Sequence, residues 1–243
     1  MAYRVALAGI DGSGKSTAAS FLVDRLAGDY KVLKSGRPIY TQEGDDRTYH
    51  FERANGMIDR MHSHFDRSGS RPGIVLVNGA GFVLRLNAER RMMNRFSPDI
   101  VIADRDATLC TSTYITYYAP ASRHLSAQAR VQVFSALGAN RHPDRLFYLD
   151  IDPAVAAARI NGRVDEGYLY ADRHRDKFRH MHETEEDLAG LRAHYLRGVE
   201  VLSNKGVSVT MVEVTHMTQT EVVDFVEGEL RSELGRAMRQ PEP

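Results

Sequence analysis

The stretch GIDGSGKST at residues 9–17 constrains the fold more than any other part of the chain. Its Gly-x-x-x-x-Gly-Lys-Ser spacing is that of a phosphate-binding loop, whose glycines let successive backbone N–H groups point at phosphate oxygens. A strand-like apolar run precedes it at 3–9, and a helical pattern follows it. The apolar face of that helix is expected to contain Ala18, Phe21, Leu22 and Leu26. A strand, a glycine-rich turn and a helix N-terminus form an anion site, so the sequence predicts a loop that binds a nucleoside triphosphate.

Two side chains of this loop have distinct expected roles. Lys15 would reach the outer phosphates of the nucleotide, and the Ser16 hydroxyl would coordinate Mg²⁺. The other residues expected at the nucleotide are Gly9, Asp11, Gly12, Ser13, Gly14 and Thr17.

Strand-like apolar runs alternate with helical stretches along the chain. They lie at 3–9, 30–35, 99–104, 145–151 and 207–214. This alternation predicts an α/β fold in which a parallel sheet is covered by helices on both faces. Segment 73–86 fits a strand or a buried helix and is assigned as a helix, and 174–203 is predicted to be helical.

The chain has no recognisable linker, repeat or low-complexity segment. We therefore expect one domain over residues 1–238 and a disordered tail at 239–243. Lys plus Arg and Asp plus Glu both number 32, which argues against a nucleic-acid or membrane-surface partner. The single Cys110 excludes an intrachain disulfide, no apolar stretch could cross a bilayer, and the run before the loop is too short for a signal peptide. A cytoplasmic protein is expected.

Charged residues follow two of the predicted strands. Asp104 ends the run IVIAD, where a carboxylate at the carboxyl end of a parallel strand faces the ligand crevice and could hold Mg²⁺ beside Ser16. Arg105 comes next and could meet a second anion, and Arg37 follows the preceding strand near the same edge. The ten histidines show no metal-ligand spacing, so no zinc site is predicted.

A run of arginines follows the fourth strand. Asp152 is expected to cap the helix that carries Arg159 and Arg163, and Arg173 and Arg175 come after it. A Gly-containing segment flanked by arginines, here about residues 160–175, is typical of a lid that brings cations onto transferring phosphates. The alternative is a loop with solvated arginines.

These elements favour a small-molecule kinase over other proteins with a phosphate-binding loop. A GTPase would need Asn-Lys-x-Asp, and the nearest text, NKGV at 204–207, lacks the Asp. A phosphate acceptor would need no general base, whereas a hydroxyl acceptor would, with Asp11, Glu43 and Asp106 as candidates.

Four stretches in this order resemble the thymidylate kinase family of nucleoside monophosphate kinases: GIDGSGKST, NAERR, VIADRD and PDRLFYLDIDPAVAAARINGR. The related deoxynucleoside kinases share a similar plan. The resemblance spans residues 3 to about 214. It implies a three-layer P-loop kinase fold with about five parallel strands and an arginine-containing lid, ATP and Mg²⁺ as phosphoryl donor, and a homodimer.

The resemblance also implies roles for single residues. Lys15 and Ser16 match the phosphate and metal ligands, and Arg159 is expected at the nucleotide. Because position 13 is Ser rather than a basic residue, the lid would supply the catalytic cation from Arg163 or Arg173.

On the acceptor side, Asp11 matches an acidic position near the sugar and Arg90 matches an arginine that contacts the base. The pair Asp104 and Arg105 matches an Asp-Arg pair whose Arg binds the acceptor phosphate, a phosphate that Arg37 would also contact.

The departures from the family pattern fall on the acceptor side. Ala8 replaces a Glu, Pro38 directly follows Arg37, and Asp106 replaces an aromatic residue. ATP-dependent phosphoryl transfer is therefore the firmer prediction, with dTMP as the first candidate acceptor. The alternatives are a nucleoside or another small phosphorylated or hydroxylated metabolite, and an ATP-binding regulator without catalysis.

Overall fold

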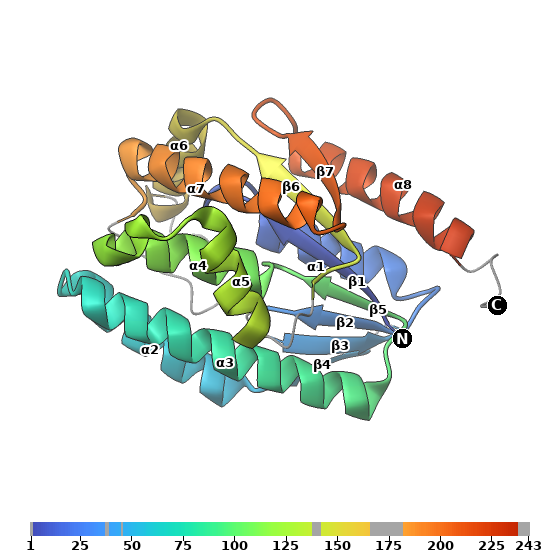
Figure 1. Ribbon diagram of the computed structural model, residues 1–243. Helices are drawn as coiled ribbons and strands as arrows, with labels where there is room; N and C mark the ends of the chain where they lie inside the picture. The colour runs from blue at the N-terminus through green and yellow to red at the C-terminus, as the bar shows by residue number, and fades with distance from the viewer. Residues whose placement is uncertain (1, 37–38, 45, 138–141, 166–181, 238–243) are drawn as a thin grey trace.

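A seven-stranded sheet runs through the centre of the protein in the order β4-β3-β2-β5-β1-β6-β7 (Figure 1). The computed structural model describes residues 2–36, 39–44, 46–137, 142–165 and 182–237. Five strands are parallel: β1 (Tyr3–Ala8), β2 (Val32–Ser35), β5 (Ile100–Ala103), β6 (Arg145–Asp150) and β7 (Ser208–Glu213). They are the five strands that the sequence predicts, and they confirm the α/β class.

The remaining two strands form a hairpin at the edge of the sheet that the sequence did not predict. β3 (Ile39–Glu43) pairs antiparallel with β2, and β4 (Asp46–His50) pairs antiparallel with β3. Tyr40 is buried in this hairpin, and the Arg47 guanidinium lies 4.2 Å from its ring centroid. The stacked cation and the buried ring stabilise an edge whose outer strand is largely exposed.

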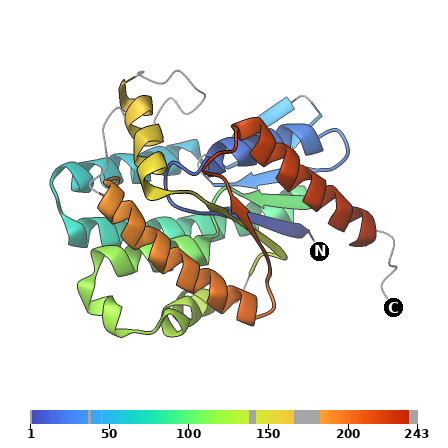
Figure 2. The same ribbon diagram turned by 90° about the horizontal axis from the view of Figure 1, so that it is seen from above.

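Helices cover both faces of the sheet (Figures 1 and 2). On one face, α1 (Lys15–Leu26) packs against α8 (Gln219–Ala237). The other face carries α3 (Arg71–Phe96), α4 (Ala107–Tyr118), α5 (Ala127–Leu137) and α7 (Glu185–Asn204). The remaining helical segments are α2 (Glu52–Arg67), the 3₁₀ turn η1 (Pro120–His124) and α6 (Pro153–Asp165). Because β1 and β5 are covered on both sides, their side chains are almost wholly apolar and buried.

Helix α1 has the expected buried face with one exception. Ala18, Leu22 and Leu26 are buried, but Phe21 is 46% exposed, so its assignment to this face is wrong. The face is instead completed by Ala19 and Val23, which are fully buried.

The two long helices on the opposite face differ in how well their limits were predicted. α3 contains all of 73–86, which confirms the helical assignment there. α7 begins at Glu185 rather than at 174; residues 182–184 are not helical, and 174–181 lie outside the described residues. Thr184 caps α7 by accepting from the Asp187 N–H, and the acidic first turn complements the helix dipole. No helix in the described ranges is long and apolar enough to cross a membrane.

Candidate active site

The phosphate-binding loop connects β1 to α1 through three glycines with positive φ: Gly9 (144°), Gly12 (85°) and Gly14 (89°). A Cβ on Gly12 would lie 2.7 Å from the carbonyl oxygen of Ala156 in α6. A Cβ on Gly9 would lie 2.5 Å from the carbonyl oxygen of Leu149 in β6. Glycine is required here because the loop packs against backbone that cannot move aside.

Lys15 lies over this loop and is almost fully buried. Its Nζ donates to the Ile10 carbonyl oxygen at 2.6 Å and to Ser13 Oγ at 3.3 Å, and lies 3.9 Å from Asp11 Oδ1. Ser16, in the first turn of α1, is partly buried. The ammonium group is therefore held at the loop that the sequence predicts will bind phosphates.

Asp104 and Arg105 lie directly after β5, beside the carboxyl end of β2. The Asp104 backbone N–H donates to the Ser35 carbonyl oxygen at 2.8 Å, and the Asp104 side chain is buried. A Cβ on Gly36 would lie 2.8 Å from Asp104 Cβ, so glycine at that position leaves room for the carboxylate. Arg105 donates to Asp11 Oδ1 at 2.8 Å, and this contact joins the end of β5 to the phosphate loop.

Asp11 is the centre of a hydrogen-bonded cluster. Besides the bond from Arg105, its Oδ2 accepts from the Tyr114 hydroxyl at 2.5 Å and lies 3.0 Å from His182 Nε2. Burial alone would raise the pKa of Asp11, but Arg105, His182 and Lys15 together hold it well below its usual range. Asp11 is therefore an ionised anchor and a poor proton acceptor.

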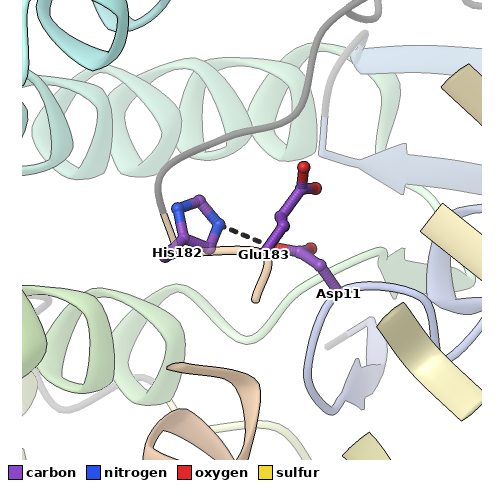
Figure 3. A group of neighbouring side chains, drawn as sticks. All are labelled: Asp11, His182 and Glu183. Carbon is purple, nitrogen blue, oxygen red and sulfur yellow. Dashed lines mark hydrogen bonds and ion pairs between the residues drawn. The ribbon is translucent and has the colours of Figure 1, made fainter. Parts of the chain in front are cut away.

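His182 and Glu183 are buried beside Asp11 and were not predicted (Figure 3). The three residues could each offer one ligand atom to a metal ion, with these atoms within 4.8 Å of one another. A divalent ion there would face the Arg105 and Lys15 cations that already neutralise Asp11, which opposes metal binding. His182 lies 171 residues from Asp11, and no local pattern connects them.

Asp106 caps α4. Its Oδ1 accepts from the Leu109 N–H at 2.6 Å, and burial raises the pKa of its carboxyl although that hydrogen bond opposes the shift. Asp106, which replaces an aromatic residue of the family pattern, therefore has a structural role as the N-cap of α4. Asp152 likewise caps α6 as predicted, because its Oδ1 accepts from the N–H groups of Ala154 and Val155.

Two other predicted site residues are exposed. Arg90 is exposed on α3, whereas its neighbour Glu89 is buried and accepts from Arg4 and from Ser35 Oγ. Glu43 is exposed at the end of β3.

Arg159 contacts the loop between β7 and α8. Its guanidinium donates to the carbonyl oxygens of Val214, Thr215 and Met217 at 3.2, 3.3 and 3.4 Å. Arg37, Arg173, Arg175 and the side chain of Arg163 lie outside the described residues, as does the predicted lid beyond residue 165 and the tail at 239–243.

Comparison with known proteins places these features in a wider context. A family described as "AAA domain" matches residues 5–188. Among solved structures, the chain is similar to deoxyadenosine kinase from M. mycoides with the products dCMP and a flexible dCDP (TM-score 0.60), with dATP (0.55) and with dCTP (0.56). Each is 14% identical, and each alignment covers 94% of this chain and 99% of the other. No curated protein matches the sequence. The fold is that of P-loop kinases.

Proposed function

We propose that this chain, which belongs to the AAA domain family, is a kinase that transfers the γ-phosphoryl group of ATP to a hydroxyl group of a nucleoside. The fold, the phosphate-binding loop and the buried Lys15 support phosphoryl transfer. The similar structures are those of a deoxyadenosine kinase, which supports an acceptor of the nucleoside class.

The contact between Arg105 and Asp11 carries the choice of a hydroxyl over a phosphate acceptor. Arg105 is the residue expected to bind an acceptor phosphate, yet its guanidinium is already neutralised by Asp11 at 2.8 Å. Asp11 cannot easily give way, because Tyr114 and His182 hold its other oxygen. Glu183 adds a second buried carboxyl group next to Asp11. A neutral acceptor avoids the repulsion that a phosphate dianion would meet there.

Ser16 and Asp104 fit a magnesium ion. One offers a hydroxyl and the other a buried carboxylate, and Mg²⁺ prefers such hard oxygen donors. When bound, Mg²⁺ would neutralise charge on the ATP phosphates. Lys15 and the loop N–H groups would hold the β- and γ-phosphates. We propose that Arg159 also contacts the nucleotide, and that Arg163 or Arg173 of the predicted lid supplies the catalytic cation.

A hydroxyl acceptor loses a proton during the transfer, and we assign Glu183 to receive it. Of the carboxylates expected from sequence, Asp106 caps α4, Asp11 is paired with Arg105 and Glu43 is exposed. Besides Asp11 itself, Glu183 is a second carboxyl group of the Asp11 cluster, and it is buried. Arg90 and Arg37 remain proposed contacts of the acceptor.

The second candidate acceptor is dTMP. It is favoured by the pair Asp104 and Arg105, which matches the pair that binds the acceptor phosphate in thymidylate kinases. In that case Asp11 would have to release Arg105 when dTMP binds, and no general base would be needed.

The test is acceptor-dependent ADP release with ATP and Mg²⁺, with Lys15→Ala as the blank. Nucleosides, nucleoside monophosphates and small hydroxylated metabolites are compared at equal concentration. Turnover with nucleosides that exceeds turnover with dTMP is the expected result. A preference for dTMP would overturn the choice of acceptor, and ATP binding without turnover for any acceptor would indicate a regulator.

We also propose that the protein is a cytoplasmic homodimer. Four apolar side chains on α3 and α5 are 51–66% exposed, and we call them the apolar α3–α5 face: Leu76, Val83, Val133 and Leu137. The rings of Phe82 and Phe134 pack edge to face at 5.5 Å and join the two helices. A two-fold contact would cover this face on both copies with a single interaction.

A further inference from the structure

His182, three residues before α7, connects this part of the chain to the phosphate-binding loop. Its Nε2 lies 3.0 Å from Asp11 Oδ2, and its Nδ1 lies 2.5 Å from the hydroxyl of Tyr118 at the end of α4. The ring is only 3% exposed. Since an ionised carboxylate can only accept, Nε2 must carry the hydrogen of the Asp11 contact. With that hydrogen placed, Nδ1 can accept from Tyr118.

Two tyrosine rings fix the orientation of this imidazole. The rings of Tyr114 and Tyr118 pack edge to face against it, with centroid distances of 5.1 and 5.9 Å. Tyr114 also donates to the same Asp11 oxygen that His182 contacts. The imidazole is therefore a rigid spacer between Tyr118 and Asp11 and has little freedom to rotate away.

The contact constrains how Asp11 faces Arg105. His182 and Tyr114 hold Oδ2, and this leaves Oδ1 directed at the Arg105 guanidinium at 2.8 Å. We propose that His182 is a positioning residue for the acceptor: its Nε2–H holds Asp11 in the orientation that keeps Arg105 at the acceptor site. This inference rests on the proposed kinase function. His182 acts through Asp11 and need not touch the acceptor itself.

Two substitutions separate this role from simple filling of space. The amide nitrogen of His182→Gln can reach the position of Nε2 and donate to Asp11, whereas that of His182→Asn is one methylene shorter and reaches only the position of Nδ1. We expect His182→Asn to raise the KM for the nucleoside acceptor at least about 10-fold, the loss expected for one hydrogen bond to a charged group. The Kd for ATP should stay within about two-fold, and His182→Gln should restore most of the acceptor KM.

The matched control is His124→Asn, because His124 is exposed on η1. Steady-state kinetics give the acceptor KM and kcat, calorimetry gives the ATP Kd, and thermal unfolding shows that each variant is folded. If the wild-type protein phosphorylates a nucleoside but the Asn and Gln variants have equal acceptor KM values, the positioning role of His182 is overturned. The proposed kinase function is not affected by that outcome. A parallel loss of ATP affinity would also overturn the positioning role, because the defect would then lie in the whole loop. A wild-type protein that phosphorylates no acceptor would overturn the proposed function, and this inference with it.

Discussion

Arg105 and Asp11 form an ion pair at 2.8 Å that joins the carboxyl end of β5 to the phosphate-binding loop. Their side chains are 20% and 12% exposed, so the pair is largely shielded from water and its attraction is stronger than at the surface. In the proposed function, Arg105 would therefore offer the acceptor a guanidinium whose charge is already balanced by Asp11. This balance is the physical basis for expecting a neutral acceptor.

Replacing Asp11 by Asn tests that balance. The variant keeps the shape of the side chain but leaves the Arg105 charge uncompensated, so we expect dTMP to compete with the nucleoside acceptor at concentrations about 10-fold lower or less. The loss of charged hydrogen bonds should also lower the free energy of unfolding by about 1–3 kcal/mol. Competition is measured as inhibition of nucleoside-dependent ADP release. Unchanged inhibition by dTMP would contradict the argument, and Asp29→Asn, an exposed carboxylate beyond the far end of α1, is the control.

Glu183→Gln tests the assignment of the proton acceptor. The amide keeps the size of the side chain and cannot take up a proton, so kcat with a nucleoside should fall by about 100-fold or more while the ATP Kd is unchanged. Steady-state ADP release at saturating nucleoside gives kcat, and calorimetry gives the ATP Kd. Glu185→Gln, an exposed neighbour in the first turn of α7, should behave as wild type. Wild-type kcat in Glu183→Gln would exclude this residue as the base.

A charge placed on the apolar α3–α5 face tests the homodimer. Leu137→Glu changes a side chain that is 66% exposed, so we expect dissociation into monomers at micromolar concentration with little change in thermal unfolding of the chain itself. Sedimentation velocity measures the mass. Phe225→Glu, an exposed apolar residue on α8 over the opposite face of the sheet, should remain dimeric. A wild-type monomer at these concentrations would contradict the proposal.

Local sequence patterns predicted the parts of the fold that depend on local interactions. The loop around Lys15 and the Asp152 cap follow from spacing alone, and the five parallel strands are apolar runs between helical stretches. The β3–β4 hairpin was missed because its outer strand is mostly polar and exposed, and its stability comes from pairing and from Arg47 on Tyr40.

The missing part of the site has a different physical cause. His182 and Glu183 reach Asp11 only after the chain has crossed most of the sheet, and a charged stretch around them reads as a solvated helix. Burial of these side chains is a property of the tertiary fold. Asp106 was considered as a base because its capping role depends on where α4 begins, a limit that spacing defines poorly.

The Asp106 carboxyl predicts a specific pH dependence of stability. Burial raises its pKa in the folded protein, whereas in the unfolded chain it ionises at about pH 3.8. Between these two values the folded state binds more protons than the unfolded state, so the stability that Asp106 contributes falls as the pH rises through the folded pKa. Asp106→Asn cannot ionise and remains a good cap. Its free energy of unfolding relative to wild type should therefore increase as the pH rises from the unfolded pKa towards the folded pKa, and then level off.

Asp106→Ala serves as the control for the cap itself. It removes the acceptor of the Leu109 N–H, so it should be less stable than Asp106→Asn by about 1 kcal/mol at every pH. Urea unfolding of the wild type and both variants at several pH values measures these differences. Asp11, whose pKa is lowered, causes a loss of stability as the pH falls, which is the opposite dependence. This loss occurs in all three proteins, so it cancels in the comparison. A wild-type to Asn difference that does not change across this range would show that Asp106 ionises in the folded protein as it does in the unfolded chain.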